Sequence, residues 1–259
     1  PIIKQNQLLE EDFFPSLKKI FISGYWKDVY PGTALYRPLT IFSFWVNQNI
    51  LGKTPFFFRL PNIFLHAAIS FLIFIIFSGI FKSKRAGFIL AFIFLVHPVH
   101  TEVVAGIVGR AELLCTLFML LSFYLYTLFS LKKDRKFLLF SNFFFVFALL
   151  SKENAIIFPL ILLLFDLLFN GEKKKFKRIS GFFIVSLIYL LVRYYILGSF
   201  GPTQVGVFFK GVEFKFLFLT AVKIIFYYYK FLFFPFYQAP DYSNNAVAVV
   251  YSPFDLRFL

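Results

Sequence analysis

Residues 57–81 read FFRLPNIFLHAAISFLIFIIFSGIF, an apolar run whose one charged residue, Arg59, lies near its start. A helix of this length is long enough to cross the roughly 30 Å hydrocarbon core of a bilayer. Residues 113–131 and 179–197 form two further runs of the same character. The sequence therefore predicts an all-α protein that crosses a membrane several times.

The composition of the whole chain agrees with this prediction. Of the 259 residues, 59% are hydrophobic and only 15% are charged. A soluble globule of this size would need far more polar residues on its surface. The net charge of +14 comes from lysines and arginines that concentrate in short loops between apolar runs, a pattern typical of membrane topology signals. We therefore expect membrane lipid, and no nucleic acid, among the partners.

The basic loops predict the orientation of the chain. Twelve Lys and Arg residues lie in three of them, residues 82–85, 132–136 and 173–178. The turns that face the other way carry only Arg110 and Lys152, so the positive-inside rule places the three loops in the cytoplasm. Residues 137–150 and 155–169 are each short for a full span. We predict that they form a hairpin of two short helices that turns at residues 151–154.

These assignments divide the chain into three regions. They are an extracytoplasmic loop with juxtamembrane helices at residues 1–55, a helical transmembrane core of about six spans at residues 56–198, and an extracytoplasmic loop at residues 199–259. Short helices are expected near residues 12–20 and 40–50. Residues 213–236 form an amphipathic helix that either lies in the interface or crosses the membrane. Its lysines share one face, which favours the interface.

Polar residues gather where residues 86–96 reach the outer surface. Residues 97–102 read HPVHTE, and ionisable groups at membrane depth indicate a functional site. Glu102 is a candidate catalytic base that His97 or His100 would orient, and Glu102 and His100 are also candidate metal ligands. Alternatively, the histidines bond backbone groups at a turn and Glu102 pairs with Arg110.

Two cations near the outer ends of helices are candidates for binding a lipid phosphate. Lys152 lies in the turn between the two short helices, and Arg193 lies less than two turns from the outer end of its span. Lysine and arginine bind phosphate by charge and hydrogen bonds. Alternatively, both side chains snorkel to water. Arg37 joins the polar groups at the outer end of the first span, where Asn62 and His66 also lie.

Several short motifs follow one another in a recognisable order. They are YRPLT at 36–40, residues 58–66, HPVHTE at 97–102 with GRAEL at 109–113, LSKE at 150–153, and LFFP at 232–235 with DYS at 241–243. In this order they closely resemble the transmembrane O-mannosyltransferases that target cadherins and the prokaryotic relatives of these enzymes. That family belongs to the GT-C class of multi-span glycosyltransferases, in which tetratricopeptide repeats follow a helical membrane domain.

The resemblance implies a function. Members transfer a sugar, mannose in animals, from a polyprenyl phosphate donor to a hydroxyl acceptor on the non-cytoplasmic side, with a divalent metal as a possible cofactor. The acceptor is expected to be a protein or a glycan. Glu102, with His97 and His100, would form one wall of the active site. The donor phosphate would be bound by a set of cations: Arg37, Arg110, Lys152 and Arg193.

One departure from the family pattern bears on activity. The resemblance implies a catalytic acidic pair at the outer end of a first membrane helix, just before the segment that residues 1–4 resemble. That pair is absent here, and Glu10, Glu11 and Asp12 lie too far along the loop to take its role. We therefore expect this chain to be the interior of a longer enzyme and inactive by itself. The Phe, Ile and Lys bias favours a prokaryotic cytoplasmic membrane, with the endoplasmic reticulum expected if the source is eukaryotic.

Two other functions remain open at this point. In a transporter, His66, His97, His100 and Glu102 would line an ion path, although transporters usually place such groups near the midplane. In a non-catalytic membrane scaffold, the motifs would only hold the helices together.

Overall fold

The computed structural model describes residues 9, 13–25, 35–169, 175–198, 212–235 and 248–252. Every regular element in these ranges is a helix, which confirms the predicted all-α class. The chain divides into two compact units, one of residues 1–96 and 103–203 and the other of residues 97–102 and 204–259. Several predicted features lie outside the described residues: residues 1–4, Glu10 to Asp12, Lys173, Lys174 and the 241–243 motif.

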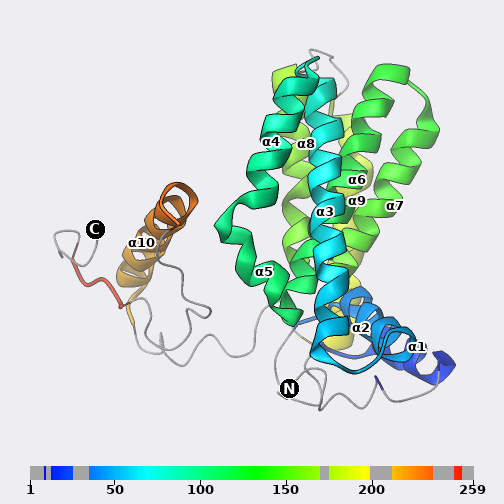
Figure 1. The fold of residues 1–259 in the computed structure, drawn as a ribbon, viewed down its shortest axis with the longest axis vertical. Helices are drawn as coiled ribbons and strands as arrows, with labels where there is room; N and C mark the ends of the chain where they lie inside the picture. The colour runs from blue at the N-terminus through cyan, green and yellow to red at the C-terminus, as the bar shows by residue number, and fades with distance from the viewer. Residues whose placement is uncertain are drawn as a thin grey trace. The chain divides into compact units, whose positions relative to one another are not determined.

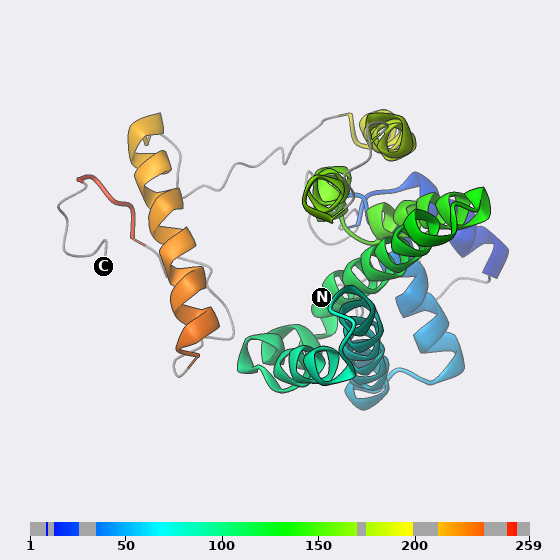
Figure 2. The ribbon, with the colours of Figure 1, turned by 90° about the horizontal axis from the view of Figure 1, so that it is seen from above.

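The first unit is a helical bundle with two helices across one end (Figure 1). The bundle helices are α3 (Pro55–Ile80), α4 (Lys84–Val96), α6 (Arg110–Lys132), α7 (Arg135–Ser151), α8 (Phe158–Phe169) and α9 (Lys175–Leu197). The short elements α5 (Thr101–Ala105), η3 (Ile107–Gly109) and η4 (Glu153–Ile157) connect them. Seen from above, α8 and α9 are viewed close to end-on (Figure 2).

Neighbouring bundle helices pair through tight turns. Helix α6 ends at Lys132, and the next residue, Lys133, adopts a left-handed conformation. Asp134 then caps α7 by accepting a hydrogen bond from the Lys136 N–H. Helices α3 and α4 approach closely at Gly87, where a Cβ would lie 2.8 Å from the Phe74 carbonyl oxygen. A glycine is therefore needed where these two helices cross.

Helices α1 (Phe13–Ile22) and α2 (Pro38–Ile50) lie across the lower end of the bundle (Figure 1), close to the two helices predicted in this region. They pack against each other and against α3 through a small apolar core that includes Ile20, Phe44 and Phe58. This end of the bundle therefore has a fixed floor, formed by helices that run crosswise to the others.

Four helices are long and apolar enough to cross a membrane: Pro55–Ile80, Ile107–Lys132, Lys177–Leu197 and Phe214–Phe233. The first three confirm the predicted spans, and the bent pair Lys84–Val96 and Pro98–Ala105 would make a fifth. Helices α7 and α8 have 17 and 12 residues, which confirms the predicted hairpin of short helices. Large apolar side chains such as Phe71 and Leu187 are exposed on the bundle, as expected of a surface that faces lipid. The chain is an integral membrane protein.

The second unit contains η2 (Pro98–His100) and α10 (Phe214–Phe233). Residues 248–252 pack against α10, where the Val250 N–H donates to Thr220 Oγ1 at 3.1 Å and the rings of Phe216 and Tyr251 are 5.1 Å apart. Lys223 is buried here, with its ammonium 5.6 Å from the Tyr227 ring centroid. The predicted basic stripe of α10 therefore includes a lysine that is covered by protein.

Candidate functional site

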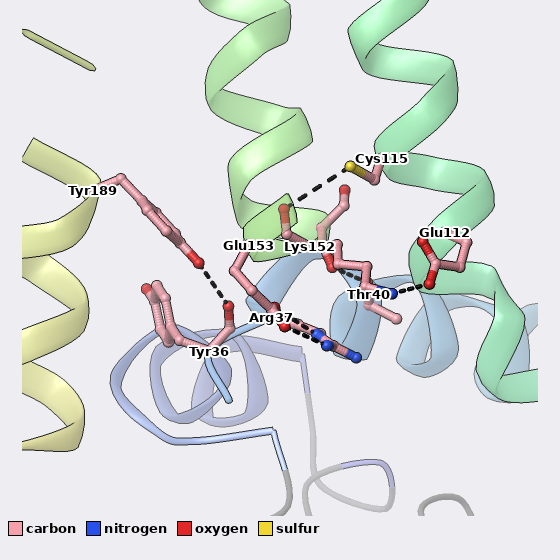
Figure 3. Close-up of polar contacts among 9 residues, drawn as sticks. Tyr36, Arg37, Thr40, Glu112, Cys115, Lys152, Glu153 and Tyr189 are labelled. Carbon is pink, nitrogen blue, oxygen red and sulfur yellow. Dashed lines mark hydrogen bonds and ion pairs between the residues drawn. The ribbon is translucent and has the colours of Figure 1, made fainter. Parts of the chain in front are cut away.

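Three of the sequence motifs meet at the end of the bundle that α1 and α2 cover (Figure 3). They are residues 36–40 at the start of α2, residues 109–112 at the start of α6, and residues 151–153 between α7 and η4. Thr40 Oγ1 donates to the Ser151 carbonyl at 2.9 Å and thereby joins the first motif to the third.

A two-point ion pair joins Arg37 to Glu153. Arg37 Nε donates to Glu153 Oε2 at 2.9 Å and Nη2 donates to Oε1 at 2.6 Å, with side chains only 11% and 23% exposed. Burial disfavours both charges, but their mutual hydrogen bonds and attraction outweigh it, so the pKa of Arg37 is raised and the pKa of Glu153 is lowered. Arg37 also lies 5.3 Å from the Tyr25 ring centroid. The pair fixes the start of α2 against the α7–α8 turn.

A second ion pair joins Lys152 to Glu112, in which Lys152 is mostly buried and Glu112 is half-exposed. Burial, together with the charge of Arg37, lowers the pKa of Lys152. The Cys115 thiol approaches the Lys152 carbonyl at 3.9 Å. Two adjacent residues of the third motif thus form ion pairs with different parts of the chain: Lys152 with Glu112 on α6, and Glu153 with Arg37 before α2.

Arg110 is almost fully buried, with 2% of its surface exposed. Its Nε donates to Asn62 Oδ1 at 3.0 Å, and its Nη2 donates to Asn47 Oδ1 at 2.9 Å and to the Phe58 carbonyl. The guanidinium carbon also lies 4.8 Å from the centroid of the Phe44 ring. Arg110 thereby links α6 to α2 and α3. These partners are all neutral, so none of them balances its positive charge.

A cavity of about 380 Å³ opens beside Glu153. Its lining consists of Glu153, Asn154, Ile156, Ile157, Tyr189 and Arg193. The Tyr189 hydroxyl donates to the Tyr36 carbonyl at 3.3 Å, which fixes α9 to the segment before α2. The cavity therefore combines an apolar wall with one cation and one carboxylate at the end of the bundle.

Several charged side chains gather at this end of the bundle. Among the described residues they include four cations, Arg37, Arg110, Lys152 and Arg193, and two carboxylates, Glu112 and Glu153, which pair with Lys152 and Arg37. Cations gathered in this way can attract an anion. The four cations predicted to bind phosphate all belong to the first unit, and two of them, Arg37 and Lys152, form ion pairs that were not predicted.

The other predicted site residues, His97, His100 and Glu102, belong to the second unit. His97 Nδ1 accepts from the Val99 N–H at 3.2 Å, so in this hydrogen-bond network its Nε2 donates to the Leu232 carbonyl at 2.9 Å. The rings of His97 and His100 are 6.1 Å apart, and Glu102 is exposed. The 97–102 motif thus contacts the 232–235 motif through His97.

Metal binding needs more ligands than these residues offer. Within the described ranges, no group of three His, Cys, Asp or Glu side chains gathers to hold a metal ion. His97 uses both ring nitrogens for protein contacts, which leaves His100 and Glu102 as the ligands that the sequence suggested. The metal stays a prediction, which chelation by EDTA in a transfer assay would test.

Two further polar residues, His66 and Asp166, form hydrogen bonds that stabilise the bundle. His66 is buried, bonds the Leu95 carbonyl at 3.1 Å through Nε2 and stacks on Phe94. Asp166, also buried, accepts a hydrogen bond from the Tyr126 hydroxyl at 2.7 Å. Both contacts join helices within the bundle.

The fold and this cluster define a class: multi-span helical membrane proteins with cationic groups at one end of the bundle. A family model described as dolichyl-phosphate-mannose-protein mannosyltransferase matches residues 37–196. This match covers more than half of the chain and includes the three motifs of the cluster except for Tyr36. The chain therefore belongs to this family, which confirms the resemblance drawn from its motifs.

Curated relatives agree with this assignment. The protein O-mannosyl-transferase TMTC1 of Mus musculus is 36% identical over 176 residues, which cover 62% of this chain and 19% of that protein. The protein O-mannosyl-transferase TMTC4 of Homo sapiens is 38% identical over 158 residues, or 53% of this chain and 21% of that protein. The chain thus spans about a fifth of the length of the curated relatives it matches. No solved structure matches.

Proposed function

We propose that this chain forms part of a membrane glycosyltransferase that transfers a sugar, mannose in the named relatives, from a polyprenyl phosphate donor to a hydroxyl acceptor. The relatives are named as protein O-mannosyl-transferases, which favours a protein acceptor. The family match supports the reaction class.

The observation that carries the proposal is the cavity at this end of the bundle, which joins the Arg193 guanidinium to apolar side chains. A polyprenyl phosphate needs cations for its phosphate and an apolar surface for its chain, and the cavity lining supplies Arg193 together with Ile156 and Ile157. When the sugar is transferred, negative charge grows on the leaving phosphate, which nearby cations stabilise. We assign this role to Arg193 with Arg37 and Lys152, while Arg110 contributes its charge from within the protein.

The acceptor hydroxyl must lose a proton during transfer. Glu102 is the residue we propose for this step, with His97 and His100 orienting it, because an exposed carboxylate accepts a proton from a hydroxyl in its reach. The bond between the sugar and the phosphate breaks as the new bond to the acceptor oxygen forms, and the phosphate leaves on the donor lipid.

The arrangement of the turns supports an outward-facing site. The basic turns after α3 and α6 lie at the opposite end of the bundle from α1, α2 and the cluster (Figure 1). By the positive-inside rule those turns face the cytoplasm. We therefore propose that the cluster works on the extracytoplasmic face, in a prokaryotic cytoplasmic membrane or, in a eukaryote, on the luminal side of the endoplasmic reticulum.

The test uses the full-length protein in lipid nanodiscs with radiolabelled mannosyl polyprenyl phosphate and an acceptor protein. Arg193→Gln should lower transfer about 100-fold or more, because one stabilising cation is lost where charge develops. Lys84→Gln, at the basic turn on the opposite end, is the matched control and should transfer normally. If Arg193→Gln and Lys84→Gln transfer equally well, the cavity does not bind the donor. If the wild-type protein transfers no sugar, the scaffold interpretation replaces the proposal.

A further inference from the structure

Asn62 connects the buried Arg110 to the chain segment that follows Glu102. The Asn62 side chain is fully buried, and its Oδ1 accepts from Arg110 Nε at 3.0 Å. Its Nδ2 donates to the Gly106 carbonyl at 3.0 Å and lies 3.4 Å from the Val104 carbonyl. The Asn62 amide thus accepts at one end and donates at the other, which a carboxylate in its place cannot do.

A second contact restrains the same segment. A Cβ on Gly109 would lie 2.1 Å from the Val103 carbonyl oxygen, so the backbones at these two positions touch and no larger residue fits. The Gly109 N–H donates to the Gly106 carbonyl at 3.1 Å. Residues 103–109 therefore form a tight backbone turn, and the Asn62 side chain on α3 binds this turn by hydrogen bonds.

We propose that Asn62 is a positioning residue for the transfer reaction. It fixes the backbone at residues 104–106, and Val104 lies in the same short helix, α5 (Thr101–Ala105), as Glu102. A carboxylate acting as a base must be held to within a fraction of an ångström of its productive place. The inference rests on the proposed function, in which Glu102 takes the acceptor proton.

Asn47 offers a matched control. Its Oδ1 also accepts from Arg110, at 2.9 Å, and it too is buried. Its Nδ2 makes no hydrogen bond in the part of the chain that the structure describes. Changing either asparagine to aspartate places a carboxylate against Arg110, but only Asn62→Asp removes the donor to Gly106. The difference between the two variants isolates that donor.

The experiment compares Asn62→Asp and Asn47→Asp in the full-length protein in nanodiscs. Hydrogen exchange of the peptide covering residues 103–109 is measured with the kinetics of mannosyl transfer. We expect Asn62→Asp to exchange about tenfold faster in this peptide, since a buried hydrogen bond to the backbone is lost. Its kcat should fall about 100-fold with the donor KM within about twofold, because misplacement affects chemistry more than donor binding. Asn47→Asp should match the wild type in exchange. Because both variants place a carboxylate against Arg110, the loss of kcat in Asn62→Asp beyond that in Asn47→Asp reports the positioning role.

A third variant keeps the inference testable if Asn62→Asp does not fold. Gly109→Ala disturbs the same backbone without touching Asn62 or Arg110, and it should likewise raise exchange and lower kcat. Faster exchange with an unchanged kcat would overturn the positioning role while leaving the proposed function intact. Equal exchange in Asn62→Asp and Asn47→Asp would overturn the backbone link itself. Absence of transfer in every protein, wild type included, would overturn the proposed function and the positioning role with it, whatever the exchange data show.

Discussion

Arg37 and Glu153 lie 116 residues apart in the chain and form a two-point ion pair, with Nε to Oε2 at 2.9 Å and Nη2 to Oε1 at 2.6 Å. The planar guanidinium matches the carboxylate at both oxygens, a geometry that lysine does not reproduce. The pair joins the residue before α2 to the turn between α7 and α8, so it connects the crosswise floor to the bundle.

Glu153→Gln should destabilise the protein by about 2–3 kcal/mol, because it leaves a mostly buried guanidinium without its counter-charge. Thermal unfolding in nanodiscs measures the change. The control is Glu213→Gln, which removes an ion pair to Lys215 of similar length, 2.7 Å, but with both side chains about two-thirds exposed. That change should cost less than about 0.5 kcal/mol. Equal losses in the two variants would show that burial does not strengthen the Arg37 pair.

The same pair predicts how stability depends on pH. Burial opposes the charge of Glu153, but the hydrogen bonds and charge of Arg37 outweigh it and hold the pKa of Glu153 below its ordinary value of 4.5. The unfolded chain therefore takes up a proton at a higher pH than the folded one, and stability falls with acid. The contribution of Glu153 is complete above the unfolded pKa and is lost as the pH falls through the folded pKa.

Melting temperatures measured from pH 7 down to about pH 3 test this expectation. The wild-type protein should lose more stability over this range than Glu153→Gln, which has no carboxylate at this position. Parallel curves for the two proteins would show that Glu153 does not titrate in folding.

The apolar runs predicted the bundle well because span length and loop charge are local properties of the sequence. The hairpin of short helices was predicted for the same reason: the length of each run and the basic loops on both sides left little room for another arrangement. Helices α3, α6 and α9 are found within a few residues of the predicted bounds. The cations of the cluster were also identified, because charge near the end of an apolar run is visible in the sequence.

The partners of those cations were not predictable in the same way. Arg110 was expected to face either phosphate or Glu102, yet it bonds the amides of Asn47 and Asn62 on two other helices. Glu112 follows Arg110 by two positions, and residues at that spacing on a helix point in different directions. Arg110 therefore turns toward α2 and α3, while Glu112 pairs with Lys152. Tertiary contacts over such separations leave no spacing signal in one sequence.

Glu112 forms an ion pair with Lys152, which predicts an effect on donor binding. If Lys152 binds the donor phosphate, Glu112 competes with that phosphate for the same ammonium. Glu112→Gln should then lower the inhibition constant of polyprenyl phosphate about twofold to fivefold, the range expected for a partly exposed ion pair.

Inhibition of mannosyl transfer by polyprenyl phosphate gives this constant. Lys152→Met should raise the same constant, and the double variant should resemble Lys152→Met alone, because Glu112 then has no ammonium to hold. An unchanged constant in Glu112→Gln would remove Lys152 from the donor site.

Gly87 and Gly79 provide a prediction about packing within the bundle. A Cβ on Gly87, in α4, would lie 2.1 Å from Ser78 Oγ and 2.8 Å from the Phe74 carbonyl oxygen, whereas a Cβ on Gly79, in α3, would meet nothing within 4 Å. The Ser78 side chain can rotate away, but the Phe74 carbonyl belongs to the α3 backbone and cannot. Gly87→Ala must therefore push α4 away from α3 and should cost about 1–3 kcal/mol, as overpacking of a tight contact does. Gly79→Ala should be neutral or stabilising by up to about 1 kcal/mol, because alanine favours the helix more than glycine does. Thermal unfolding of the two variants side by side measures both effects, and equal melting temperatures would mean that α3 and α4 do not approach as closely as the structure shows.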